Sequence, residues 1–223
     1  MEEKHISQEP TESRKMEMGD DLEDTVGTTV VGFTMRGGII FVSDSLSHSS
    51  KTGEVKPNVK AQKILPLKFS LVGAGSGASK HVKSKLKGLL QEYGTLYCLE
   101  SKDGNASKER YFCIGSGEGP MKRFREKPYK AADGRMRNWD VHQMTSDQAA
   151  EFCKEAICYV SLRDRGTGGH VSVYFLSRQT GECTKIVDEE DIEGLLDNQY
   201  PHLRREYQQM LAKKPRASFK AKK

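Results

Sequence analysis

A threonine that directly follows a glycine has the most distinctive chemistry in this chain. Gly27 and Thr28 stand between an acidic segment and the first β-branched run. If the chain is cut between them, Thr28 carries a hydroxyl nucleophile and a free α-amine on one residue. Such an amine has an ordinary pKa of about 7.7–8.0, so it can accept a proton near neutral pH, which a peptide nitrogen cannot do. The alternative is that Thr28 and Thr29 are ordinary strand residues, because threonine favours strands.

The composition fits a polar globular chain of about one domain with tails. Of its 223 residues 35% are hydrophobic and 30% are charged, and the formal net charge is +5. Part of the basic excess lies in the last stretch, from Lys213 to Lys223. A tail of this kind can bind nucleic acid or an acidic partner, but we expect a solvated tail and no specific nucleic acid.

The cysteines and histidines show no metal-binding pattern. None of the five cysteines forms a Cys-x-x-Cys pair, and the six histidines are scattered. We therefore expect no metal and no cofactor. The first 27 residues are charged and contain no apolar core of a signal peptide, and no run reaches membrane-spanning length. These features predict an intracellular protein with reduced cysteines and no membrane contact.

The order of the expected elements predicts an α+β domain with mostly antiparallel sheets. Residues 1–27 are expected to be a removable or disordered pro-segment. Strands are expected over 28–35 and 39–42, joined at Gly37-Gly38, with both faces buried, and over 63–67 and 69–72. A helix follows from about Ser79, and 96–99 and 111–114 form another hairpin. Residues 118–144 are polar and predict a long insertion.

The second half of the chain has clearer signals. Thr145 to Gln148 is a capping box, and it opens a helix with apolar residues at helical spacing from Ala149 to Val160. Strands are expected over 170–176 and 183–187, and short helices over 188–198 and 201–211. The resulting division is 1–27, a domain over 28–188, and C-terminal helices with a basic tail over 189–223.

Four motifs in this order resemble the beta subunits of the 20S proteasome, and among them the beta type-5, chymotrypsin-like subunit. They are Gly27-Thr-Thr-Val-Val-Gly-Phe33 with Gly38-Ile-Ile-Phe-Val-Ser-Asp-Ser45, Gln62-Lys-Ile-Leu-Pro-Leu67 with Gly73-Ala-Gly-Ser-Gly-Ala78, Cys113-Ile-Gly-Ser-Gly117, and Ala156-Ile-Cys-Tyr-Val-Ser-Leu-Arg-Asp-Arg-Gly-Thr-Gly-Gly-His170. Each motif is weak alone. The resemblance covers roughly 28–187 and leaves out the pro-segment, the 118–144 insertion and the basic tail.

The resemblance implies an N-terminal-nucleophile hydrolase fold, in which two antiparallel sheets stack face to face between helices. It implies a threonine-type endopeptidase that is made as a zymogen and degrades unfolded polypeptides. It also implies stacked heteromeric rings with other alpha and beta subunits, in cytoplasm and nucleus.

The resemblance also implies roles for residues at matching positions. Thr28 would be the nucleophile, and Lys63 would stabilise its alkoxide while Asp44 keeps that lysine charged. The backbone N–H of Gly75 would form the oxyanion hole. Three further residues would orient the terminal amine: Ser116, Asp164 and Thr167. Lys60 is the alternative to Lys63, which we prefer because Ile64-Leu65 follows it directly.

Some positions depart from the family pattern. Thr167 stands where the family usually has serine, and Gly73 stands where chymotrypsin-like members usually have methionine. The stretch between Gly75 and Ser116 is much shorter than in the family, so part of the sandwich is expected to be missing. The alternative function is therefore a non-catalytic or truncated structural subunit. Gly75 can also lie in a plain tight turn. A phosphate-binding loop over Gly73–Lys80 is a poor alternative, because the spacing matches neither the Walker pattern nor Gly-x-Gly-x-x-Gly.

Overall fold

The computed structural model describes residues 25–26, 29–46, 48–49, 63–68, 71–74, 96–99, 106–130 and 136–213. Several predictions lie outside these residues. They concern residues 1–24 and Gly27 of the pro-segment, Thr28, Gly75, Lys60, the helix from Ser79, and the basic tail beyond Lys213.

The centre of the fold is a hairpin of two largely buried strands. Strand β2 (Thr29–Met35) pairs antiparallel with β3 (Gly38–Asp44), and Met35 lies opposite Gly38. Every residue of β3, and every residue of β2 except Thr34, is buried. The prediction of a hairpin with two buried faces is confirmed, because β-branched side chains on both faces need cover on both sides.

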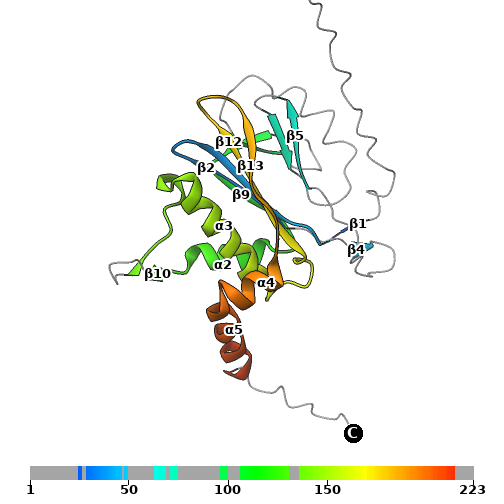
Figure 1. Cartoon of the computed structure of the whole chain (residues 1–223), viewed down its shortest axis with the longest axis vertical. Coiled ribbons are helices and arrows are strands. Elements are labelled where there is room, and N and C mark those ends of the chain that lie inside the picture. Colours follow the sequence, from blue (N-terminus) through cyan, green and yellow to red (C-terminus); the bar gives the residue numbers. More distant parts are fainter. Residues whose placement is uncertain are drawn as a thin grey trace, which may run out of the picture.

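This hairpin lies inside a five-stranded antiparallel sheet. Its order is β13-β12-β3-β2-β9, with β9 at Tyr111–Gly115, β12 at His170–Ser177 and β13 at Cys183–Asp191. Val171 of β12 lies opposite Asp44, and Gly115 of β9 lies opposite Thr29. The sheet and the helices beside it are visible in Figure 1. The α+β class with antiparallel pairing is confirmed.

One predicted strand pairing is wrong. We expected 96–99 to form a hairpin with 111–114, but β7 (Leu96–Leu99) pairs with β8 (Ala106–Glu109). Strand β9 instead forms the edge of the central sheet against β2. The polar sequence of β8 did not predict a strand, whereas the more apolar β9 has a buried strand as its neighbour.

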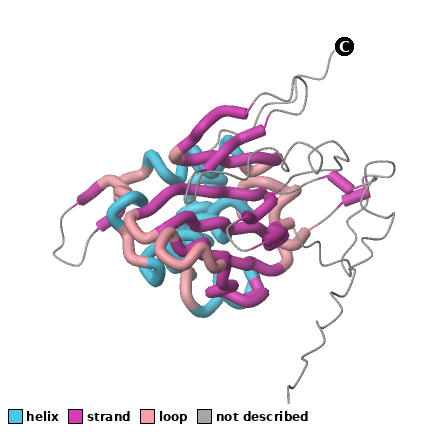
Figure 2. Tube along the Cα trace, turned by 90° about the horizontal axis from the view of Figure 1, so that it is seen from above, coloured by secondary structure: helices cyan, strands magenta, loops and turns pink. Residues whose placement is uncertain are grey.

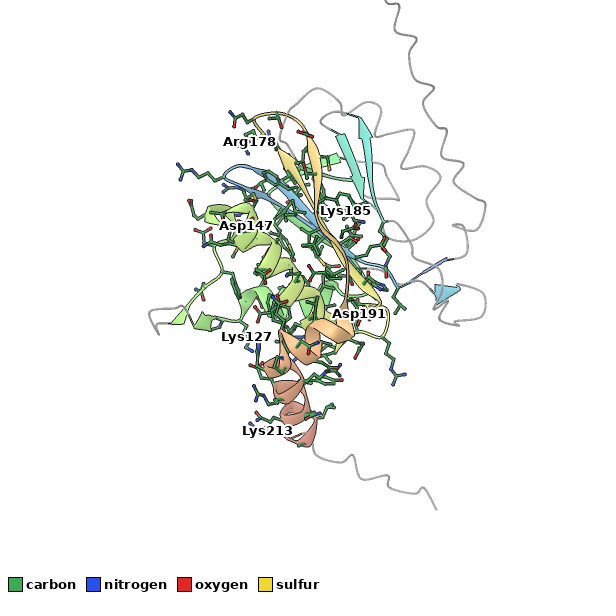
Figure 3. All side chains as sticks on the ribbon, viewed as in Figure 1. Lys127, Asp147, Arg178, Lys185, Asp191 and Lys213 are labelled. Carbon is green, nitrogen blue, oxygen red and sulfur yellow. The ribbon has the colours of Figure 1, made fainter. Side chains whose placement is uncertain are left out.

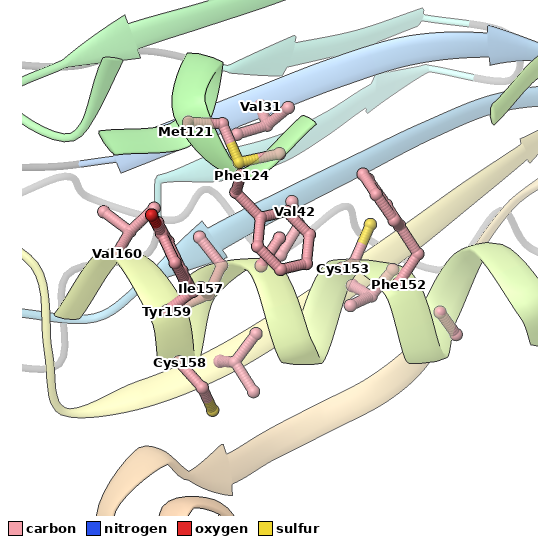
Figure 4. Close-up of a cluster of buried hydrophobic side chains, with 14 of the residues drawn as sticks. Val31, Val42, Met121, Phe124, Phe152, Cys153, Ile157, Cys158, Tyr159 and Val160 are labelled. Carbon is pink, nitrogen blue, oxygen red and sulfur yellow. The ribbon is translucent and has the colours of Figure 1, made fainter. Parts of the chain in front are cut away.

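Helices cover one face of the sheet. Helix α3 (Ser146–Ser161) starts at the predicted capping box, where Thr145 and Gln148 exchange side-chain-to-backbone hydrogen bonds of 3.0 and 3.3 Å. Its predicted apolar stripe is buried against Val31 and Val42 of the sheet and against Met121 and Phe124 of α2 (Glu118–Glu126), as Figure 4 shows. In Figure 2 the strands of the sheet pass across these helices.

The 118–144 stretch differs from the expected polar insertion. Pro120, Met121 and Phe124 of α2 are buried, and Trp139 stacks on Phe124 with ring centroids 5.9 Å apart. Sequence analysis missed the apolar residues of α2 because they are few and most of the stretch is charged. They nevertheless fall on one side of the helix. The short helix η2 (Val141–Gln143) and the strand pair β10 (Tyr129–Lys130) and β11 (Met136–Arg137) complete it.

The opposite face of the sheet packs on shorter strands. Strands β5 (Ile64–Lys68) and β6 (Leu71–Ala74) form the predicted antiparallel pair. Ile64 and Leu96 are buried with Val30, Ile39 and Phe41 in a second core. The sheet therefore has helices on one face and strand pairs on the other (Figure 1).

The C-terminal part contains the two predicted short helices, but the prediction of a helix from residue 188 is wrong, because residues 188–191 continue strand β13. Strand β13 runs on to Asp191, whose carboxylate accepts the N–H of Gly194 at 2.7 Å and so caps α4 (Ile192–Asn198). Asp191 is labelled in Figure 3 at this junction, and α5 (Pro201–Lys213) extends beyond it to Lys213. A short pair, β1 (Thr25–Val26) and β4 (His48–Ser49), lies outside the main sheet. No helix in the described part of the chain has the length and apolar content needed to span a bilayer.

Substitution of Phe152 tests the packing of α3 against the sheet. Its ring is 2% exposed and lies 5.8 Å from the Phe33 ring and 4.9 Å from the Trp139 ring, measured between centroids. We expect Phe152→Ala to lower the free energy of unfolding by about 3–5 kcal/mol in urea titrations, because the lost side chain leaves a cavity. Met210→Ala, at a position 36% exposed on α5, should change it by less than about 0.5 kcal/mol. Equal effects of the two substitutions would contradict this packing.

Candidate functional site

The Asp44 carboxylate collects hydrogen bonds from four segments of the chain. It lies at the end of β3 and is 1% exposed. Its Oδ1 accepts the Thr29 N–H at 2.9 Å and the Lys63 ammonium at 2.7 Å. Its Oδ2 accepts the Gly168 N–H at 2.9 Å and the Leu46 N–H at 3.3 Å. Asp44 therefore fixes the start of β2 against the segments before β5 and before β12.

Lys63 is the lysine that meets Asp44 in the structure. It directly precedes β5, and its side chain is 5% exposed. Its Nζ also donates to the carbonyl oxygen of Leu46 at 2.7 Å. A buried ammonium needs such acceptors, since an unpaired charge in the interior is costly. The predicted pairing of Lys63 with Asp44 is therefore present, and Lys60 lies outside the described residues.

Burial and ion pairing act in opposite directions on this pair. Burial raises the pKa of the Asp44 carboxyl and lowers the pKa of the Lys63 ammonium below its ordinary value. The attraction between the two charges and their hydrogen bond opposes both pKa shifts. The Thr29 and Gly168 N–H groups also lower the pKa of the Asp44 carboxyl.

A second network joins hydroxyl groups to the Asp164 carboxylate. Ser116 Oγ donates to Asp164 Oδ2 at 2.7 Å, and Thr167 Oγ1 donates to the same oxygen at 2.6 Å. The Gly166 N–H donates to Asp164 Oδ1 at 3.2 Å. Three of the predicted site residues are thus in direct contact, although Ser116 lies far from the other two in sequence. The threonine at position 167 provides the hydroxyl for which the family pattern has serine.

Two tight turns bring these residues together. Asp164 follows the end of α3, where its N–H bonds to the Val160 carbonyl at 2.9 Å. Ser116 lies in the turn between β9 and α2, and that turn packs against Gly166 so closely that a Cβ there would lie 2.4 Å from Ser116 Oγ. Gly169, at φ +75°, continues the second turn into β12. The backbone of Gly168 accepts from both Ser45 and Leu46.

Thr29 links the two networks. Its N–H bonds to Asp44, and its Oγ1 lies 2.6 Å from Thr167 Oγ1. Thr29 is fully buried, and a Cβ on Gly117 would lie 2.1 Å from its hydroxyl. Sequence analysis missed this role, because a threonine at the start of a strand is ordinary.

The contacts therefore unite five of the predicted site residues around Thr29: Asp44, Lys63, Ser116, Asp164 and Thr167. Thr28 and Gly75 lie outside the described residues. Thr28 directly precedes Thr29 in the sequence. Within the described ranges no group of His, Cys, Asp and Glu side chains is arranged to hold a metal ion.

The chemistry open to such a site is hydroxyl activation. A buried ammonium stabilises an anion that develops beside it, and a carboxylate with bound hydroxyls orients a neighbouring proton donor. Both groups are held by backbone contacts and do not have to rearrange during a reaction.

Replacing Asp44 should lower the free energy of unfolding more than replacing Lys63. Asp44→Asn leaves Lys63 without a counter-ion and turns an amide N–H₂ toward backbone N–H groups, so we expect a loss of about 3–5 kcal/mol in the free energy of unfolding. Lys63→Met should cost less, because the carboxylate keeps three backbone donors. Urea titrations of the two variants measure this order, and a larger loss in Lys63→Met would contradict it.

Gly117, just before α2, and Gly119, inside α2, provide a matched pair of glycines. Gly117→Ala places a Cβ 2.1 Å from Thr29 Oγ1 and 2.7 Å from Val160 Cγ1, so it should displace Thr29 and lower the melting temperature. Gly119, within α2, has its nearest neighbour at 3.8 Å, on the Arg123 side chain. Gly119→Ala should be neutral or stabilise by about 0.5–1 kcal/mol, because alanine favours helices. Equal melting temperatures in the two variants would contradict the close approach at Gly117.

No model of a known family matches this sequence. No curated protein matches it either. The function is therefore inferred from the motifs in the sequence and from the contacts around Thr29.

Proposed function

We propose that this chain is a catalytic beta-type subunit of a 20S proteasome core, acting as a threonine endopeptidase. Autocatalytic cleavage between Gly27 and Thr28 would free the nucleophile. One observation carries the proposal: residues at family-matched positions, spread from Asp44 to Thr167, meet around the residue that directly follows Thr28.

The proposed mechanism begins with the hydroxyl of Thr28. Its oxygen attacks the scissile carbonyl while its own α-amine accepts the proton, through a water. The Lys63 ammonium stabilises the developing alkoxide and is itself held by Asp44. The Gly75 N–H would stabilise the oxyanion of the tetrahedral intermediate, a contact typically worth about 2.7–4 kcal/mol. On collapse the scissile C–N bond breaks, the protonated α-amine gives its proton to the leaving nitrogen, and an ester remains on Thr28. Water then attacks the ester, with the α-amine as base, and frees the Thr28 hydroxyl.

The Asp164 network has a distinct place in this mechanism. Ser116 and Thr167 both donate to one carboxylate oxygen, so their own oxygens have fixed orientations. Each oxygen keeps lone pairs that can accept from a nearby amine. The network would therefore orient the terminal amine for proton transfer.

The proposal includes the N-terminal-nucleophile hydrolase sandwich, with part of it shortened. Support comes from the five-stranded antiparallel sheet with α2 and α3 on one face and the β5–β6 pair on the other. Such a subunit would bind other alpha and beta subunits in stacked rings, in cytoplasm and nucleus, and would take unfolded polypeptides as substrates. The mechanism needs no metal or cofactor.

Substitution of Thr28 tests the proposal in particles that contain this chain. Thr28→Ala should abolish hydrolysis of a fluorogenic peptide with a large apolar residue before the cut, while Thr28→Ser retains part of it. Thr184→Ala, which changes an exposed threonine on β13, should match the wild type. N-terminal sequencing of the wild-type chain should begin at Thr28.

The alternative structural role predicts different results. A mature chain that still begins at Met1, with equal peptide hydrolysis in wild type and Thr28→Ala, would overturn the catalytic proposal. It would favour a non-catalytic beta-like subunit.

A further inference from the structure

The hydrogen-bond network around Asp164 has a single possible direction. A threonine hydroxyl carries one proton, and an ionised carboxylate has none to donate. Thr167 Oγ1 donates its proton to Asp164 Oδ2 at 2.6 Å. The 2.6 Å contact between Thr29 Oγ1 and Thr167 Oγ1 therefore has Thr29 as its donor. The chain of donors runs from Thr29 to Thr167 to Asp164.

This direction determines what Thr29 can do next. Its only hydroxyl proton is committed to Thr167, and its backbone N–H is committed to Asp44. The side-chain oxygen keeps lone pairs, so it can only accept from any further group. Thr29 is also fully buried and packed by Gly117, which leaves it little freedom to rotate.

Thr29 therefore holds a fixed position relative to both charged groups of the site. Its backbone is tied to the Lys63–Asp44 pair and its side chain to Asp164. Residue 28 is joined to Thr29 by one peptide bond, so two soft dihedral angles separate it from this anchored residue. A change in the orientation of Thr29 therefore changes the orientation of residue 28.

We propose that Thr29 is a positioning residue, whose hydroxyl bond to Thr167 aligns the preceding nucleophile between the Lys63 ammonium and the Asp164 network. The inference rests on the proposed function and assigns a role to a residue outside its catalytic set. The hydroxyl carries this role, and the side chain is closely packed, because a Cβ on Gly117 would lie 2.1 Å from Thr29 Oγ1 and 3.0 Å from Thr29 Cβ.

Two substitutions separate the hydroxyl from the shape of the side chain. Thr29→Val keeps the shape and a β-branched residue in the strand, and it leaves the Thr167 bond to Asp164 intact. Thr29→Ser keeps the hydroxyl and loses the methyl group. In purified particles, kcat for the fluorogenic peptide should fall about 10- to 100-fold in Thr29→Val with KM unchanged, because misalignment affects the transition state. Thr29→Ser should remain within a few-fold of wild type.

Thr34→Val is the matched control, since it makes the same change on the same strand. Its Oγ1 makes only a 3.4 Å contact to the Arg110 carbonyl, so kcat should not change. If Thr29→Val does not assemble, Thr29→Ala takes its place, and the contrast with Thr29→Ser is kept.

The outcomes distinguish the two proposals. The positioning role is overturned if the wild type is active and Thr29→Val keeps the full kcat. It is also overturned if Thr29→Ser is as impaired as Thr29→Val. Both results leave the proposed function intact. Wild type that shows no hydrolysis and no processing at Gly27 overturns the proposed function itself, and the positioning role falls with it.

Discussion

The buried Asp44 carboxylate is the contact on which the rest of this site depends. It accepts from the first residue of β2, from the segment after β3, from the lysine before β5 and from the turn before β12. A carboxylate without these donors would be costly in an interior where it is 1% exposed. Because this buried carboxylate needs hydrogen-bond donors, it sets the relative positions of the four segments that supply them.

The two networks that meet at Thr29 differ in their access to water. The Lys63–Asp44 pair is sealed, with side chains 5% and 0% exposed. Ser116 is exposed and Asp164 is half-buried, so the hydroxyl network reaches the surface. A hydrolytic site needs both properties, because a charge acts more strongly away from water while substrate and water must still enter. The sheet supplies the sealed side, and the turns after β9 and α3 supply the open one.

The sequence predicted the elements whose signals are local. The capping box at Thr145, the apolar stripe of α3 and the β2–β3 hairpin depend on neighbouring residues and agree with the structure. The pairing of β9 with β2 depends on contacts between distant segments, and α2 is amphipathic with few apolar residues, so both were missed. Family motifs indicated that Asp44 meets Lys63 and that Ser116 meets Asp164. Thr29 was missed because its role comes from two contacts that no local pattern encodes.

The central claim is that Thr28 carries a hydroxyl and a free amine that act together. Treatment of assembled particles with a peptide electrophile that acylates hydroxyl groups, followed by mass spectrometry of the digested chain, tests it directly. The account predicts one dominant adduct, on a peptide that begins at Thr28. An adduct on another residue, or an unmodified peptide that still spans Gly27 and Thr28, would contradict it.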